Sequence, residues 1–197
     1  AERNIQKDFI TLHVGTGTFK PVKSETIEAH DMHMEHIEVS VATIENILTH
    51  IDKVIVVGTT SLRTIETLYW LGVKLKMNKA LNTYNRDSAS FSLTQWECYE
   101  IEEQNISATD SLRSLLKWMK ENKTERLLAK TQILIAPGYT FKIVKGLITN
   151  FHQPQSTLLL LIAAFIGKDW RNVYDHALNN YFRFLSYGDG CLLWLNP

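Results

Sequence analysis

Glycine, threonine and histidine gather near the start of the chain, in the stretch Leu12-His-Val-Gly-Thr-Gly-Thr-Phe-Lys-Pro21. Because glycine has no Cβ, a turn built on Gly15-Thr16-Gly17 lets the backbone approach a ligand closely. The neighbouring hydroxyl and amide groups can bind a sugar or a phosphate. A single Gly-x-Gly pair also serves many proteins as a simple turn after a strand. The stretch is therefore either a ligand-binding loop or an ordinary turn.

A second binding point is predicted at Gly58, where a strand should lead into a helix. The β-branched run Ile51–Val57 is typical of a strand that is buried on both faces. Apolar residues in Thr59–Leu68 recur at the spacing of one helix face, and a hydroxyl residue at 59, 60 or 61 can cap the helix. The free amides and the positive dipole end of such a helix suit an anion or a ligand hydroxyl.

Three histidines and a glutamate near residue 33 raise the question of a metal site. His30, His33, His36 and Glu35 are the kinds of ligand that zinc or iron prefers. On a strand, His33 would point away from the other two histidines, and on a helix steps of three residues drift around the surface. The rings do not converge in either case, so we expect no bound metal.

Composition indicates an ordinary globular protein. The chain has 197 residues, enough for one sizeable domain, of which 45% are hydrophobic and 21% charged. Its formal net charge is zero, so a nucleic acid would have to be met by a local basic patch. Cys98 and Cys191 are far apart and indicate reduced thiols in the cytoplasm. The apolar run Leu158–Ile166 is too short for a membrane span, which needs about 20 residues.

Apolar runs that end in Gly or Pro alternate with stretches of helical period, a pattern that predicts an α/β fold. We expect one α/β domain over residues 1–197, with a mixed sheet or a barrel-like arrangement and helices on the outside. Strands are predicted at 32–39, 51–57, 132–138, 141–149 and 183–193, and helices at 41–50, 59–68, 109–120, 154–167 and 170–181.

Polar residues cluster at the ends of predicted strands in five places. These clusters are residues 13–18, 58–63, 137–139, 149–156 and 186–189. In α/β folds, ligands bind beyond the carboxyl ends of the strands, where loops are positioned by a rigid sheet. The five clusters are either parts of one site or five ordinary turns.

Six motifs decide between these interpretations by resemblance. They are LHVGTGTFKPV at 12–22, HDMHME at 30–35, VGTTSLR at 57–63, PGYTF at 137–141, TNFHQPQSTL at 149–158 and RFLSYGD at 183–189. In this order they closely resemble the S-adenosylmethionine:tRNA ribosyltransferase-isomerase family of queuosine biosynthesis. The resemblance covers nearly the whole chain except the segment 69–130, which is longer than expected. The family's upstream half, with its small β-barrel, is not found, so we expect this chain to be the C-terminal portion of a longer enzyme.

The resemblance implies transfer and isomerisation of the ribosyl group of S-adenosylmethionine. The acceptor would be 7-aminomethyl-7-deazaguanine at the wobble position of tRNA, and the product epoxyqueuosine, with adenine and methionine released. The sulfonium makes the neighbouring ribose carbon acidic, so the protein must supply a general base, a proton for the departing adenine and contacts to ribose hydroxyls. S-adenosylmethionine would be the co-substrate, and no metal is implied.

Roles for individual residues also come from the resemblance. The implied catalytic residues are His13, His152 and Asp189. The implied contacts to the cofactor are Gly15, Thr16, Gly17, Thr59, Thr60, Ser61 and Tyr187. The implied contacts to tRNA or substrate are Arg63, Asn150 and Ser156. Each has a purely structural alternative: His152 bonding a backbone carbonyl, Arg63 pairing with Glu66, and residues 187–189 forming only a turn.

Two other functions stay open from the residues alone. A nucleotide- or NAD(P)-binding oxidoreductase would explain the Gly-Thr-Gly turn, although Lys20 stands where the usual third glycine would be. A non-catalytic module that binds tRNA or protein would explain the missing upstream half. If the enzyme interpretation holds, we expect the isolated chain to fold but to release no adenine. The sequence leaves the oligomeric state open.

Overall fold

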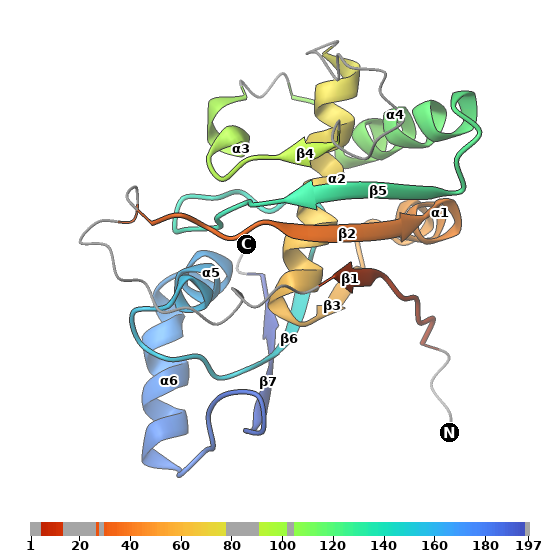
Figure 1. Cartoon of the computed structure of the whole chain (residues 1–197). Helices are drawn as coiled ribbons and strands as arrows, with labels where there is room; N and C mark the ends of the chain where they lie inside the picture. Colours follow the sequence, from red (N-terminus) through yellow and green to blue (C-terminus); the bar gives the residue numbers. More distant parts are fainter. Residues whose placement is uncertain (1–4, 14–26, 28–29, 78–90, 102–104, 196–197) are drawn as a thin grey trace.

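The computed structural model describes residues 5–13, 27, 30–77, 91–101 and 105–195, which form two open β-sheets with helices packed around them (Figure 1). The first sheet has the order β1 (Thr11–His13), β2 (Glu35–Ser40), β5 (Arg126–Thr131) and β4 (Ser92–Leu93). The second has the order β3 (Ile55–Val57), β6 (Gly146–Asn150) and β7 (Gly190–Trp194).

Both sheets contain parallel and antiparallel neighbours. Strand β5 is antiparallel to β2 and parallel to β4, and β6 is parallel to β3 and antiparallel to β7. The predicted α/β class with a mixed sheet is therefore confirmed. The alternative of a barrel-like sheet is wrong for the described residues, because the strands form two separate open sheets.

Six α-helices complete the described structure, with a short 3-10 turn at Gly167–Asp169. They are α1 (Val41–Thr49), α2 (Thr59–Lys76), α3 (Glu97–Glu100), α4 (Ala108–Glu121), α5 (Thr157–Ile166) and α6 (Trp170–Asn179). Among the described residues, no helix combines the length and the apolar composition needed to cross a membrane.

Helix α2 forms the centre of the molecule and crosses behind β2 and β5 in Figure 1. Every residue from Leu62 to Val73 is buried, as expected for a helix that contacts protein on all sides. At Gly72 an added Cβ would lie 2.2 Å from the carbonyl oxygen of Ser111, so the backbones of α2 and α4 approach closely there. One hydrophobic cluster runs around α2 and joins residues of both sheets, including Ile37 and Leu147.

Helices were predicted from sequence more accurately than strands. The four helices expected at 41–50, 59–68, 109–120 and 170–181 are present as α1, α2, α4 and α6, although α2 continues to Lys76. Gly58, and not a hydroxyl side chain at 59–61, occupies the cap position of α2. Helix α5 begins at Thr157 with Ser156 as its cap, so Pro154 lies outside the helix.

The strand predicted at 132–138 is wrong. The strand is Arg126–Thr131, and backbone groups of the residues that follow it are bonded to distant side chains. The carbonyl of Ile133 accepts a hydrogen bond from Arg63 Nε, and the amide of Ala136 donates to Tyr99 Oη. The apolar composition of this segment reflects burial in the core and not participation in a sheet.

The other four predicted strands all begin later than expected: β2 at Glu35, β3 at Ile55 and, with the largest shifts, β6 at Gly146 and β7 at Gly190. The prediction that the strand before Gly58 is buried on both faces is also wrong, since Ile55 and Val57 are exposed.

Before β6, the amides of Lys142, Ile143 and Val144 donate to the Glu66 carboxylate, so they are not free to pair with a strand. Before β7, residues 183–189 form a closed loop, in which the Asp189 amide donates to the Arg183 carbonyl at 2.8 Å.

Candidate functional site

Three of the polar clusters expected at strand ends meet at one edge of the β3-β6-β7 sheet. Strands β3 and β6 are parallel, with Val57 opposite Ile148, so their carboxyl ends lie at the same edge. The Gly58 amide donates to the Ile148 carbonyl at 2.8 Å and joins the two ends directly. Strand β7 starts at this edge, with Gly190 opposite Asn150. Such an edge is where α/β proteins commonly bind ligands.

Helix α2 begins at this edge without a side-chain cap. Gly58 has φ +91°, a conformation that glycine adopts without strain, and it leads the chain straight from β3 into the helix. No side chain of the described residues caps the first amides of α2. The first turn holds Thr59, Thr60 and Ser61, all half-buried. Uncapped helix amides are ready donors for a carboxylate, a phosphate or a ligand hydroxyl.

The loops after β6 and before β7 are bonded to each other. Asn150 Nδ2 donates to the Gly188 carbonyl at 3.3 Å, and the Leu185 amide donates to the Phe151 carbonyl at 2.9 Å. The buried Phe151 ring packs on the rings of Tyr174, Phe182 and Phe184. This aromatic cluster holds the two loops in place.

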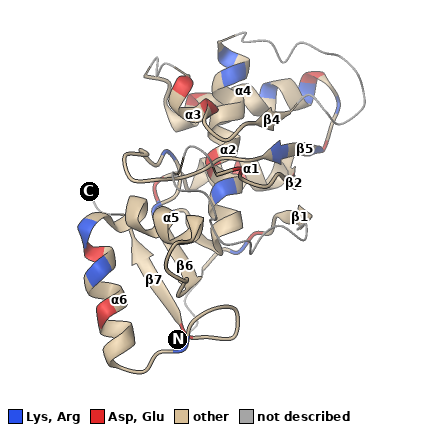
Figure 2. Ribbon diagram, turned by 60° about the vertical axis from the view of Figure 1, so that its left-hand side comes forward, with Lys and Arg blue, Asp and Glu red and all other residues tan. Residues whose placement is uncertain are grey.

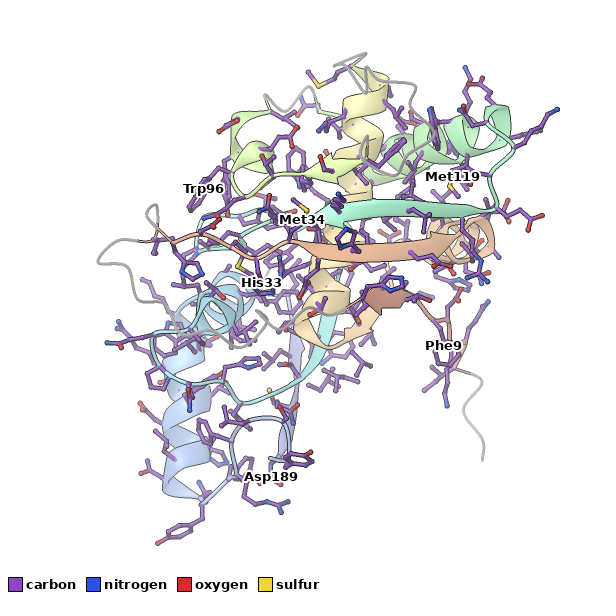
Figure 3. All side chains as sticks on the ribbon, viewed as in Figure 1. Phe9, His33, Met34, Trp96, Met119 and Asp189 are labelled. Atoms are coloured by element: carbon purple, nitrogen blue, oxygen red, sulfur yellow. The ribbon has the colours of Figure 1, made fainter. Side chains whose placement is uncertain are left out.

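Asp189 closes the loop before β7, where Figure 3 labels it. Its Oδ2 accepts from the Arg183 amide at 2.7 Å, and its Oδ1 accepts from Arg183 Nη2 at 3.3 Å. These bonds, the backbone one first, lower the pKa of the Asp189 carboxyl. Gly188 has no room for a side chain, since a Cβ would lie 2.2 Å from the Arg183 carbonyl oxygen. Tyr187 is 96% exposed, and its ring is free to contact a partner.

His152 lies just after β6 and is mostly buried. Its Nε2 is 3.0 Å from Thr149 Oγ1, and its amide donates to Tyr174 Oη at 3.1 Å. Burial lowers the pKa of His152 to about 4. The imidazole is therefore neutral at neutral pH, a state in which it can accept a proton but has none to give as an imidazolium.

Arg63 is directed into the interior of the protein. It is 3% exposed, with Nη1 3.1 Å from Oε2 of the buried Glu35 and Nε donating to the Ile133 carbonyl at 3.0 Å. Burial lowers the pKa of Arg63, and the charge of Glu35 opposes this. The alternative pairing with Glu66 does not occur. Glu66 instead accepts from Tyr139 Oη and from three backbone amides, as described above.

Other residues implied by the resemblance lie elsewhere. His13 is an exposed residue of the β1-β2-β5-β4 sheet, with its Nε2 3.9 Å from Glu38 Oε2. The Ser156 hydroxyl caps α5 by accepting from the Leu159 amide at 3.2 Å. Gly15, Thr16 and Gly17 lie outside the described residues. In the part of the chain that the structure describes, no three His, Cys, Asp or Glu side chains form a group that could hold a metal ion.

The sequence analysis missed two buried carboxylates, Glu35 and Glu66. Glu35 ends the HDMHME motif, so the motif itself was a signal, but its histidines drew attention to metal binding instead. Glu66 was considered only as a neighbour of Arg63 on the helix. Its true partners lie more than 70 residues away in the sequence.

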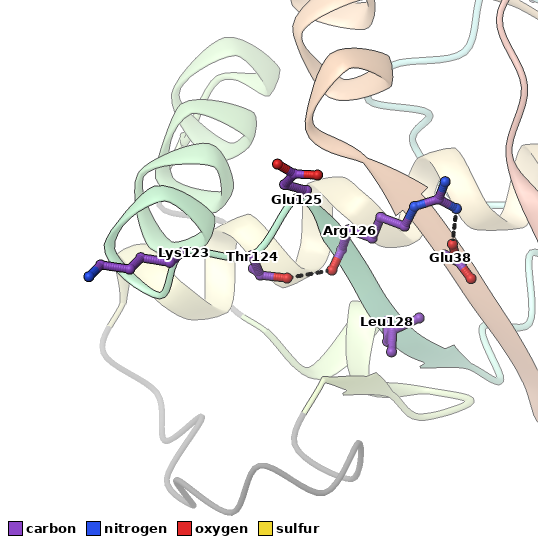
Figure 4. A pocket seen from close by; sticks show the side chains of 6 residues that line it. All are labelled: Glu38, Lys123, Thr124, Glu125, Arg126 and Leu128. Atoms are coloured by element: carbon purple, nitrogen blue, oxygen red, sulfur yellow. Dashed lines mark hydrogen bonds and ion pairs between the residues drawn. The ribbon is translucent and has the colours of Figure 1, made fainter.

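A shallow hollow elsewhere in the structure carries no catalytic arrangement. It is lined by Glu38, Leu128 and residues 123–126, and it lies at the far end of the β2–β5 pair, where Ser40 is opposite Arg126 (Figure 4). Glu38 and Arg126 form an ion pair within it. The strand ends of the other sheet therefore offer the better candidate site.

Comparisons with known proteins agree with the motifs. A family model described as "queuosine biosynthesis protein" matches residues 1–193. Among solved structures, an S-adenosylmethionine tRNA ribosyltransferase from Thermotoga maritima is 28% identical, with a TM-score of 0.49. The match covers 80% of this chain and 40% of that chain, so this chain spans less than half the length of that enzyme.

We predict that Glu35→Gln destabilises the protein by about 3–5 kcal/mol, because it leaves the buried Arg63 charge without its counter-charge. Urea denaturation at pH 7 measures this loss. Glu38→Gln is the matched control on the same strand, since Glu38 pairs with an exposed arginine and should cost below about 1 kcal/mol. Equal small losses from both variants would contradict the role of the buried pair.

We also predict a pH dependence of stability that belongs to His152. The pKa of His152 is about 4 in the folded protein, against about 6.5 for an unfolded histidine, so the unfolded state binds more protons between these values. The contribution of His152 is therefore present above about pH 6.5 and is lost as the pH falls towards 4, by up to about 3 kcal/mol.

Urea denaturation of wild type and His152→Gln at pH 7 and pH 4.5 measures this contribution. The wild type should lose more free energy of unfolding than the variant over this range. His50→Gln, which changes an exposed histidine, should behave as wild type. If His152→Gln shows the wild-type loss, His152 is not held neutral by burial.

Proposed function

Because the chain belongs to the queuosine biosynthesis protein family, we propose that it serves as a tRNA ribosyltransferase-isomerase. In this proposal it transfers and isomerises the ribosyl group of S-adenosylmethionine onto 7-aminomethyl-7-deazaguanine in tRNA. The products are epoxyqueuosine, adenine and methionine. The single observation that carries the proposal is the family match over residues 1–193.

The edge of the β3-β6-β7 sheet is the proposed cofactor site. The uncapped first turn of α2 offers amides and the hydroxyls of Thr59, Thr60 and Ser61, which suit the carboxylate or the ribose hydroxyls of S-adenosylmethionine. Gly15, Thr16 and Gly17 are proposed to complete this site. The exposed Tyr187 ring is proposed to stack on a base or to contact the sulfonium.

The ionised and neutral groups around this edge suit the chemistry. The lowered pKa of Asp189 keeps its carboxylate negative, which favours a nearby sulfonium. The neutral His152 suits a base, and His13 is proposed as a further acid or base. Asn150 and Ser156 are proposed to contact the nucleotide of the tRNA.

Arg63 takes part in this proposal through one buried donor. Its Nη2 is buried and has no hydrogen-bond partner among the described residues. Burying an N–H group without an acceptor costs about 1–3 kcal/mol, so a ligand oxygen that accepted this bond would gain accordingly. This supports a contact between Arg63 and an oxygen of the substrate or the cofactor, from inside the protein.

Helix α4 offers a local basic face for an anionic partner. Arg113, Lys117 and Lys120 are exposed and spaced by four and three residues, so they share one side of the helix. Figure 2 shows basic residues along α4. The helix also contains Asp110 and Glu121, and Lys117 pairs with Glu121 at 3.8 Å, so Arg113 and Lys120 are the stronger candidates for phosphate contacts. Contacts from this face to phosphates would give binding to tRNA that weakens steeply with salt.

The proposed function is tested by adenine release. The full-length protein is given S-adenosylmethionine and tRNA with the unmodified precursor base, and adenine is quantified by chromatography. Release that depends on both substrates supports the proposal. Binding of tRNA without any release would favour the non-catalytic module, and reduction of NAD(P) would favour the oxidoreductase.

In the same protein we predict that Asp189→Asn lowers the rate of adenine release at least ~10-fold while changing stability little, because asparagine preserves the shape of the loop but removes the negative charge. Asp175→Asn is the matched control, since Asp175 is exposed on α6. Unchanged release by Asp189→Asn would remove Asp189 from the proposed site.

A further inference from the structure

His33, Glu35 and Arg63 form a chain of contacts that leads from the surface to the interior. His33 Nε2 is 3.1 Å from Glu35 Oε1, and Glu35 Oε2 is 3.1 Å from Arg63 Nη1. The side chain of His33 is 23% exposed, whereas those of Glu35 and Arg63 are 1% and 3% exposed. One end of the chain can therefore reach a bound molecule while the other end is held in the core.

The geometry assigns the proton on His33. The Glu35 carboxylate accepts from both neighbours, so the imidazole presents its N–H at Nε2. The lone pair then lies on Nδ1, which has no hydrogen-bond partner among the described residues. A carboxylate behind an imidazole fixes its tautomer and stabilises the imidazolium that forms on protonation.

The backbone beside His33 is held on both sides. The Met32 amide donates to Gln95 Oε1 at 2.8 Å, and Gln132 Nε2 donates to the Met32 carbonyl at 3.1 Å. Gln95 Nε2 also donates to the His30 carbonyl at 2.6 Å. Figure 3 labels His33 on this segment, just before β2. Such support is what a reacting group needs to keep its position.

The chain of contacts also adjoins the proposed cofactor site. Arg63 lies one helical turn after Thr59 and Thr60, which form the uncapped start of α2. Its unpartnered buried Nη2 points to an acceptor supplied by a bound molecule. The His152 ring, by contrast, is bonded to the Thr149 hydroxyl, and no carboxylate of the described residues contacts it to stabilise a bound proton.

We propose that His33 is a catalytic acid–base residue of this site, with Glu35 and Arg63 as its positioning residues. This rests on the proposed function. Nδ1 takes the proton from the ribose carbon next to the sulfonium; the C–H electron pair stays on that carbon, and a new N–H bond forms. The imidazolium is balanced by Glu35, and it later returns the same proton to the departing adenine.

Adenine release by His33→Gln tests this role in the full-length protein. Glutamine keeps a donor for Glu35 Oε1 but has no basic nitrogen. We expect kcat to fall by about 100-fold or more, the KM for S-adenosylmethionine to change by less than about threefold, and the low-pH limb of the rate profile to disappear. His36→Gln, which changes an exposed histidine three residues later on β2, should retain wild-type kinetics.

The outcomes separate the two proposals. If wild type releases adenine and His33→Gln keeps its rate and its pH profile, the role of His33 is wrong while the proposed function stands. If wild type releases no adenine from S-adenosylmethionine and tRNA, the proposed function is wrong and the role of His33 falls with it. Circular dichroism and urea denaturation of His33→Gln show whether a lower rate reflects loss of folding. A folded variant in which KM rises while kcat falls would contradict a purely catalytic role.

Discussion

The buried ion pair between Glu35 and Arg63 determines how the two sheets are arranged. Glu35 opens β2 of the first sheet, and Arg63 lies on α2, which follows β3 of the second. Neither charge can be buried alone without a cost of several kcal/mol, so the fold requires them to meet. The second bond of Arg63, to the Ile133 carbonyl, ties the segment after β5 to the same point. The position of α2, and with it the start of the helix at the candidate site, depends on this pair.

A second buried carboxylate, Glu66, lies about one turn after Arg63 on α2 and holds another segment of the chain. Burial raises the pKa of Glu66, and the donors around it oppose this rise: the amides of residues 142–144 and the hydroxyl of Tyr139. Trp70 Nε1 in turn donates to Tyr139 Oη at 2.8 Å. These bonds hold the segment before β6, so they decide where that strand begins. Its carboxyl end at Asn150 then lies beside Gly58, where the loops of the candidate site meet.

Local pattern predicted those parts of the fold that depend on neighbouring residues. The passage from strand through Gly58 into helix could be predicted because β-branched residues, a glycine and a helical period follow one another directly. The segment after Thr131 could not, because buried apolar residues look alike in a strand and in a loop whose backbone is bonded to distant side chains. Arg63 and Glu66 illustrate the same limit: they are close in sequence and of opposite charge, yet each finds its partners 28 to 78 residues away. Of the five polar clusters that the sequence predicted at strand ends, those at 58–63, 149–156 and 186–189 lie together at one sheet edge. The other two do not join them, because His13 belongs to the other sheet and Tyr139 is buried in the core.

We expect a ligand to bind where the carboxyl ends of β3 and β6 meet the start of α2. Hydrogen exchange of the protein with and without saturating S-adenosylmethionine tests it most directly, since the amides at 59–61 have no side-chain cap among the described residues. We predict slower exchange at residues 59–62, 150–152 and 185–190. Binding that slows exchange only at the hollow around residues 123–128, and leaves the start of α2 unchanged, would contradict it.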